Sequence, residues 1–330
     1  MPQGVHLHIP FPSRISPDAE RARRVHIDWP RSYGLLSGAA AERRHRMGAY
    51  ADVAARFHPA ATGDDLDLAV DQQSWFFLFD DLFDGPAGQD PGWVRDLVGD
   101  VSSVLDGSGP PRHPLARAFA DLWARSIVGM SGRWQARAAA NWRAYLGGYL
   151  SEALTRGGTH RPLFNDYFAV RTQTIGALPV LDMAERVGHY ECPDRAFSSP
   201  LLKELRRLAV EVVILDNDIV SVEKEEAIGD VNLVLLLQAE RRCSRAAALD
   251  LMCRMIEERT IRFTALEPGM PALAASLGLD DASSEILRRY DHDALRTLMR
   301  GAYDWDQHAE RYGSEFARTQ AAAELREAQL

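Results

Sequence analysis

Cysteine and long apolar runs are both scarce in this chain. Its 330 residues include three cysteines, Cys192, Cys243 and Cys253. Their number and wide spacing exclude a disulfide framework or a zinc site, so we expect reduced thiols in the interior. No stretch approaches the roughly 18 apolar residues of a membrane-spanning helix, and MPQGVHLHIPFPSR at the start has neither the basic nor the apolar region of a secretory signal. The expected location is therefore cytoplasmic, without a membrane partner.

Positive charge is in deficit as well. Lys and Arg number 38 against 47 Asp and Glu, for a formal net charge of -9, which argues against a nucleic-acid partner because binding would need a basic face. The ten histidines are dispersed and show no HExxH or paired spacing for zinc. His292-Asp293 resembles the HD pair of metal phosphohydrolases, but no upstream partners at suitable helical positions accompany it.

Strand-like alternation is nearly absent, and the breaks between periodic segments are short Gly/Pro punctuation rather than linkers. We expect an all-α bundle around a central cavity, with residues 1–330 forming a single domain. The periodicity predicts helices over residues 38–57, 64–84, 91–105, 114–128, 131–156, 162–188, 196–226, 231–266 and 282–311, with a polar helical tail after 314.

The segment WFFLFDDLFD at 75–84 is the most informative one. On a helix, Phe76, Asp80 and Asp84 form one stripe, and Phe77 and Asp81 lie beside it. Carboxylates this close repel each other at the negative end of a helix unless a cation neutralises them. Mg2+ is the natural candidate because it takes oxygen ligands and bridges carboxylates to phosphates. The alternative is an acidic helix end that faces water, but the aromatic residues beneath favour a site.

A second segment, NDIVSVEKE at 217–225, complements the first. Asn217, Ser221 and Glu225 recur every four residues and form a stripe of oxygen ligands, while the preceding turns of that face are apolar. Lys224 lies among them and could offer an ammonium group to an anion. Alone, this spacing is also typical of a solvated polar face. Two such helix ends opposite each other could hold several Mg2+ ions.

Pro179 predicts a helix break of its own. Proline has no N–H and crowds the carbonyl four residues earlier, which belongs to Ile175, so that carbonyl should be left unpaired. Gly176 eases the local distortion. From these residues alone, a kink that wraps the helix around the core is an equally good interpretation.

The aspartate-rich DDLFD, NDIVSVEKE and the C-terminal Arg311-Tyr312 occur in the order and at the separations of class I terpenoid cyclases. The chain resembles bacterial sesquiterpene synthases over almost its entire length, including TIGALPVLDMAER at 174–186 and RGAYDW at 300–305. The resemblance implies the class I terpenoid synthase fold. It also implies a Mg2+-dependent enzyme, with three ions, that ionises farnesyl diphosphate and cyclises the carbocation to a polycyclic, triquinane-like sesquiterpene. Such enzymes are monomers or homodimers.

The resemblance also implies a role for each candidate residue. The expected metal ligands are Asp80, Asn217, Ser221 and Glu225, with Asp84 as a further candidate. The expected diphosphate donors are Arg171, Lys224, Arg311 and Tyr312. The expected groups around the reacting chain are the Ile175 carbonyl, which follows Thr174 and faces the departing diphosphate, and the aromatic rings of Phe57, Phe76, Phe77 and Trp305. Asp81 is expected to pair with an arginine.

Three alternatives stay open. The substrate could be geranyl or geranylgeranyl diphosphate, because its length depends on cavity depth. A chain-elongating prenyltransferase is disfavoured, because it would need a second aspartate-rich motif where NDIVSVEKE stands. A helical protein that binds an apolar ligand without chemistry would have no need of Asn217, Ser221 and Glu225.

Overall fold

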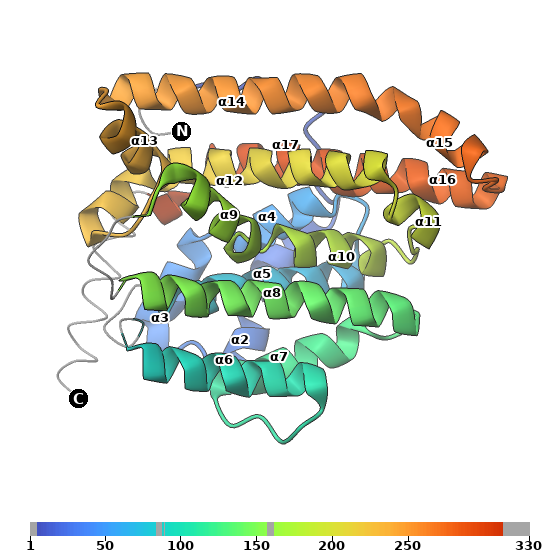
Figure 1. Ribbon diagram of the computed structural model, residues 1–330. Helices are drawn as coiled ribbons and strands as arrows, with labels where there is room; N and C mark the ends of the chain where they lie inside the picture. The colour runs from blue at the N-terminus through green and yellow to red at the C-terminus, as the bar shows by residue number, and fades with distance from the viewer. Residues whose placement is uncertain (1–4, 84–87, 89, 157–161, 313–330) are drawn as a thin grey trace.

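The computed structural model describes residues 5–83, 88, 90–156 and 162–312, and throughout these residues the regular elements are helices (Figure 1). In Figure 1 they are stacked in layers, with α14 (Arg245–Leu266) along one side and α6 (Pro91–Asp106) and α7 (Pro114–Ser126) along the opposite side. The all-α prediction is confirmed. No helix in the described part of the chain combines the length and apolarity needed to span a bilayer.

The first third of the chain leads to the aspartate-rich segment. It contains α1 (Ala19–Val25), α2 (Asp28–Ser32), α3 (Gly38–Met47), α4 (Tyr50–Phe57) and α5 (Gly63–Asp81). The predicted helix 38–57 is wrong as a single element, because the chain turns at Ala49, which adopts a left-handed conformation with φ 51°. Helix α5 ends at Asp81 rather than Asp84. Asp84 lies outside the described residues.

Helices α6, α7 and α8 (Gly132–Arg156) lie close to their predicted bounds. Each of the first two begins with a proline at its first turn and a side-chain cap, which satisfies an otherwise unpaired N–H. The Asp90 carboxylate accepts from the Gly92 N–H at 2.8 Å, and His113 Nδ1 accepts from the Leu115 N–H at 3.2 Å. Local sequence signals therefore define these helix starts.

Helices α9 (Phe164–Thr174) and α10 (Ala177–Val187) replace the predicted helix 162–188. The break falls at Ile175 and Gly176, where Gly176 has φ 72°. It lies directly before Pro179, as the missing proline N–H predicts.

The C-terminal half contains α11 (Asp194–Phe197), α12 (Pro200–Ile228), α13 (Leu233–Arg241), α14, α15 (Met270–Ser276), α16 (Asp281–Tyr290) and α17 (Arg296–Asp306). The predicted helix 231–266 is wrong as one element, because Arg242 has φ 49° and Ser244 caps α14. The predicted helix 282–311 contains a π-helical turn, Asp291–Leu295, and ends at Asp306, so Arg311 and Tyr312 lie on a separate 3₁₀ turn, Glu310–Tyr312. Helices α1, α2, α11 and α15 were not predicted, because each is too short to show a period.

Helix α12 is the centre of the bundle. It packs against α14 on one side and against α17 and α9 on others. Residues 208–216 are all buried, which is typical of a helix surrounded by other helices. The motif that starts at Asn217 therefore follows directly from the deepest part of the core.

Candidate active site

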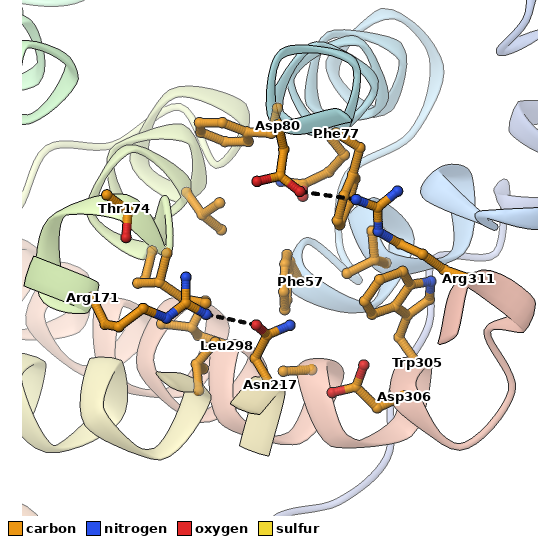
Figure 2. A pocket seen from close by; sticks show the side chains of 18 of the residues that line it. Phe57, Phe77, Asp80, Arg171, Thr174, Asn217, Leu298, Trp305, Asp306 and Arg311 are labelled. Atoms are coloured by element: carbon orange, nitrogen blue, oxygen red, sulfur yellow. Dashed lines mark hydrogen bonds and ion pairs between the residues drawn. The ribbon is translucent and has the colours of Figure 1, made fainter. Parts of the chain in front are cut away.

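A cavity opens where the ends of α5, α9 and α12 approach α4, α8 and α17 (Figure 2). Its free volume is about 140 Å³, within a pocket of about 900 Å³ that includes solvent at the open mouth. Figure 2 shows Asp80 and Arg311 on one side and Arg171 and Asn217 on the other. The predicted residues that line it are Phe57, Phe76, Phe77, Asp80, Arg171, Ile175, Asn217, Lys224, Glu225, Trp305, Arg311 and Tyr312.

Asp80 lies at the mouth, held by two donors from distant helices. Its Oδ1 accepts from the Tyr149 hydroxyl at 3.0 Å, and its Oδ2 accepts from Arg311 Nη2 at 2.9 Å. The same Nη2 donates to Asp81 Oδ1 at 2.8 Å, and Arg311 Nη1 donates to the Tyr50 hydroxyl at 2.8 Å. The side chain of Arg311 is only 2% exposed. An arginine from the C-terminal turn thus offsets part of the negative charge at the aspartate end of α5.

Asn217 occupies the opposite side. Its Oδ1 accepts from Arg171 Nη2 at 2.7 Å, and its Nδ2 donates to the Tyr312 hydroxyl at 2.9 Å. Arg171 Nε also donates to Asp218 Oδ1 at 3.0 Å, and Asp218 Oδ2 accepts from the Leu233 N–H at 2.8 Å. Sequence reasoning missed Asp218. The only sequence signal was its position next to Asn217. Helical periodicity does not show that Asp218 contacts Arg171 on another helix.

Glu225 is the carboxylate of the α12 stripe. Its Oε2 accepts from Asn232 Nδ2 at 2.8 Å. Burial, and then the nearby Asp218 charge, raise the pKa of Glu225 to about 8. Ser221 is buried without lining the cavity, and its Oγ lies 3.5 Å from the same Asn232 nitrogen. Asn232, which also caps α13 through its Oδ1, was not predicted because it follows the motif in a connecting turn.

The donor set fits a hard divalent cation. Glu225 is a buried carboxyl whose ionised form is disfavoured, so a bound cation would relieve its cost. Asp80 and Asn217 present further oxygen atoms to the same cavity. Among the described residues no three His, Cys, Asp or Glu side chains converge on one point, so any metal would be held by carboxylates together with amide or hydroxyl oxygen atoms. The individual ligand roles, including that of Ser221, stay predictions.

Aromatic rings form the wall below the acidic mouth. Phe76 stacks on Trp142 with ring centroids 4.9 Å apart. Phe77 stacks on Tyr50 at 4.3 Å and lies 5.4 Å from Trp305. The guanidinium of Arg311 lies 4.6 Å from the Phe77 centroid. One face of Phe77 therefore already attracts a cation in this structure.

The helix break places backbone against the aromatic wall. A Cβ at Gly176 would lie 3.3 Å from the Phe76 ring, so this close approach and the positive φ both require glycine. The preceding Thr174 donates from Oγ1 to Glu152 Oε1 at 3.0 Å. Both Thr174 and Ile175 line the cavity. The roles expected of them in sensing diphosphate stay predictions.

Two polar side chains that were not predicted also lie in the wall, Gln73 and Asp306. Asp306 is buried beside Asp216, and burial together with the Asp216 charge raises the pKa of Asp306 well above its usual range. Both Asp216 oxygen atoms and Asp306 Oδ1 lack a hydrogen-bond donor among the described residues. Burial therefore favours the protonated form of this carboxyl pair.

A family model covers the part of the chain that contains both motifs. The model for terpene synthase family 2, C-terminal metal binding, matches residues 72–262, which include both motifs. Pentalenene synthase of Streptomyces arenae is 47% identical over 320 residues, covering 96% of this chain and 95% of that protein. A (-)-beta-caryophyllene synthase of Saccharothrix espanaensis is 38% identical, covering 96% and 91%. The crystal structure of linalool/nerolidol synthase from Streptomyces clavuligerus superposes with a TM-score of 0.85 at 34% identity, covering 91% of this chain and all of that one.

Proposed function

The chain belongs to the terpene synthase family, and from this membership we propose that it ionises farnesyl diphosphate with Mg2+ and cyclises the carbocation to a polycyclic sesquiterpene. Membership makes it an enzyme, a lyase that forms terpenes from a prenyl diphosphate. The finer assignments of substrate length, metal identity, ion number and product are the proposal.

One observation carries the proposal. A single cavity has cationic and oxygen-rich groups at its mouth, with Arg171 and Arg311 facing Asp80 and Asn217, and aromatic rings below. A prenyl diphosphate has the matching polarity, with an anionic head and an apolar tail. The same division would hold the leaving group away from the reacting hydrocarbon.

The residues at the mouth would bind and stabilise the departing diphosphate. Arg311 is a buried guanidinium group and Arg171 a partly buried one, and both are suited to forked contacts with phosphate oxygen atoms. Lys224 and Tyr312 line the same region and would donate further hydrogen bonds. Asp80, Asn217, Ser221 and Glu225 would hold three Mg2+ ions, with Asp84 as a further candidate. When bound, Mg2+ supplies Lewis-acid stabilisation of the leaving group.

The aromatic residues would act after ionisation. Phe57, Phe76 and Trp305 offer electron density without a nucleophilic atom, and cation–π attraction contributes roughly 0.5–2 kcal/mol per ring. The Arg311 guanidinium occupies one face of Phe77. Phe77 would therefore contribute by packing against the other aromatic rings of the cavity wall. These rings also exclude bulk water, which would quench the carbocation.

The product skeleton is proposed from the relatives. Pentalenene synthase is 47% identical to this chain, so we expect a tricyclic, triquinane-like skeleton such as that of pentalenene or a related one. Farnesyl diphosphate is preferred over geranyl and geranylgeranyl diphosphate on the same ground. A second copy of the chain in a homodimer is compatible with the proposal, as is a monomer.

The test is incubation of the purified protein with each of the three prenyl diphosphates and Mg2+, with and without EDTA, followed by mass analysis of the organic extract. A cyclic C15 product from farnesyl diphosphate that disappears with EDTA is the expected result. A cyclic product from another chain length would reassign the substrate. Absence of metal-dependent diphosphate release from folded protein would contradict the proposal and favour a non-catalytic ligand-binding protein.

A double variant tests the assignment of the metal ligands. Asn217→Ala with Ser221→Ala should abolish turnover while the circular dichroism spectrum is unchanged. Mg2+ plus inorganic diphosphate should raise the Tm of the native protein and leave that of the double variant unchanged. Thr264→Ala, on α14 and outside the cavity lining, is the matched control. Turnover by the double variant at the native rate would remove these two residues from the metal site.

A further inference from the structure

Thr174 donates its hydroxyl group to a different helix. It is the last residue of α9, is 5% exposed and lines the cavity. A helical threonine usually donates to a carbonyl of the preceding turn, as Thr172 does to Ala169 at 2.6 Å. Thr174 Oγ1 instead donates to Glu152 Oε1 on α8 at 3.0 Å. The last turn of α9 is therefore held on α8 by a side-chain contact that the helix itself does not require.

A glycine on α8 makes room for this contact. Gly148 lies four residues before Glu152, so both are on the same side of α8. A Cβ at Gly148 would lie 2.5 Å from Thr174 Cγ2, which is too close for two carbon atoms. Helix α8 thus receives the Thr174 methyl group at Gly148 and its hydroxyl group at Glu152. Because both branches of the Thr174 side chain are in contact, the side chain is held in one rotamer.

The fixed threonine stands directly before the helix break. Thr174, Ile175 and Ala177 all line the cavity, so the break is itself part of the wall. Gly176 has φ 72°, and Pro179 has no N–H to donate to the preceding turn. The segment therefore gains less from helical hydrogen bonds than a regular helix does. Its position depends more strongly on contacts with other helices, such as the one with Glu152.

Glu152 also acts on Arg171. Arg171 lies one turn before Thr174, and Figure 2 shows both on the same side of the cavity. Asp218 and, more weakly, Glu152 supply negative charge that stabilises the Arg171 guanidinium. Glu152 is half-buried and does not itself line the cavity. It therefore interacts with two residues of the cavity from behind the wall.

We propose that Glu152 is a positioning residue that, through the Thr174 hydroxyl, fixes the wall at the helix break and so selects the conformation in which the prenyl chain cyclises. This inference rests on the proposed cyclisation of farnesyl diphosphate. A wall free to shift would admit several conformations of the flexible chain, and different conformations give different carbon skeletons or acyclic products. The contact between Glu152 and Thr174 thus determines the composition of the product mixture.

The experiment is turnover of farnesyl diphosphate with Mg2+ by the native protein and by folded variants, followed by mass analysis of the organic extract. Thr174→Val keeps the shape of the side chain and removes the donor, and Glu152→Met removes the acceptor. Each should lower the ratio of the principal cyclic product to all other terpenes by about fivefold or more, because a hydrogen bond to a carboxylate is among the stronger ones in proteins. Thr174→Ser and Glu152→Gln, which can still form the bond, should retain most of the native ratio.

The product ratio separates positioning from stability. A loss of folded protein lowers the total amount of product but leaves its composition unchanged. Thr172→Val is the matched control, because the Thr172 hydroxyl bonds within α9 and the residue does not line the cavity. It should keep the native ratio. Thr174→Val combined with Glu152→Met should give the ratio of either single variant, because both changes remove the same contact.

Three outcomes would overturn the inference. The native ratio in folded Thr174→Val would do so while the proposed function stands, and if that variant does not fold, the native ratio in Glu152→Met decides in the same way. Independent effects that multiply in the double variant would show that the two side chains do not act through each other. No metal-dependent turnover of farnesyl diphosphate by the native protein would reject the proposed function and the inference together.

Discussion

Arg311 Nη2 donates a hydrogen bond to Asp80 Oδ2 at 2.9 Å, although the two residues are 231 positions apart. The contact connects the short C-terminal turn to the end of α5. Because the Arg311 side chain is almost fully buried, its charge depends on Asp80 and Asp81 for compensation. The acidic motif and the C-terminal arginine therefore act as one unit.

Replacing Arg311 should disrupt the contacts between the acidic motif and the C-terminal turn. We expect Arg311→Lys to lower kcat/KM by about 100-fold or more, because lysine cannot reproduce the forked contacts of arginine. Steady-state kinetics with circular dichroism would measure it. Arg300→Lys is the control, because Arg300 pairs with Asp304 and does not line the cavity. Native kinetics in folded Arg311→Lys would contradict the prediction.

The Tyr149 hydroxyl should orient Asp80. Removing it in Tyr149→Phe keeps the ring packed against Phe79 and Phe83 but deletes the donor to Asp80 Oδ1. Loss of a hydrogen bond to a metal ligand typically weakens metal affinity by about 10- to 100-fold. We therefore expect the Mg2+ concentration for half-maximal activity to rise by that factor. The Tm should fall modestly, because the buried Tyr145 hydroxyl loses its acceptor, the Tyr149 oxygen at 3.2 Å.

Tyr190→Phe is the matched control for that experiment. Tyr190 is equally buried, and its hydroxyl has no hydrogen-bond partner among the residues described. Its replacement should leave the Mg2+ dependence at the native value. Equal Mg2+ dependence in the native protein and in Tyr149→Phe would show that the hydroxyl does not orient Asp80.

Gly176 should tolerate no side chain. In Gly176→Ala the left-handed backbone alone costs about 1–2 kcal/mol, and the new Cβ would press on the Phe76 ring. Gly229→Ala offers a control with the same strain, because Gly229 has φ 75° and open space around its Cβ position. We expect urea unfolding to show a larger loss for Gly176→Ala, and only this variant should lose activity. Equal losses of unfolding free energy in the two variants would show that the Phe76 ring moves aside without an energetic cost.

Stability should fall as the pH is lowered from about 6.5. Burial lowers the pKa of His58 to about 3, and neither ring nitrogen has a partner among the described residues. Below its ordinary value of 6.5, the unfolded chain binds a proton at His58 that the folded protein does not. The free energy of unfolding therefore decreases by up to about 1.4 kcal/mol per pH unit until the folded pKa is reached.

His58→Met should remove this contribution. Urea unfolding at pH 7, 6 and 5 should show a shallower loss of stability in the variant than in the native protein. The exposed His8 offers a control, because His8→Met should keep the native pH dependence. An identical pH dependence for the native protein and His58→Met would mean that His58 binds its proton equally well in the folded and unfolded states.

Two departures from the predicted helices share one physical cause. Single-residue conformations at Ala49 and Arg242 interrupt periodic segments that read as continuous, because tertiary packing compensates a left-handed backbone that local propensity disfavours. The break before Pro179 could be predicted, since a missing N–H is a covalent property of the residue. The prediction that residues 1–330 form one domain stays a prediction.

The sequence by itself determined the helical class and the two oxygen-rich stripes, because helical periodicity assigns side chains to a face without knowledge of neighbours. Other candidate residues of the cavity, such as Arg171 and Trp305, followed from the resemblance to the family. Only the tertiary structure decided that Arg171 pairs with Asp218 and that Asp306 faces Asp216. Those relations depend on which helices approach one another. The approach results from packing over the whole core, and no local pattern encodes it.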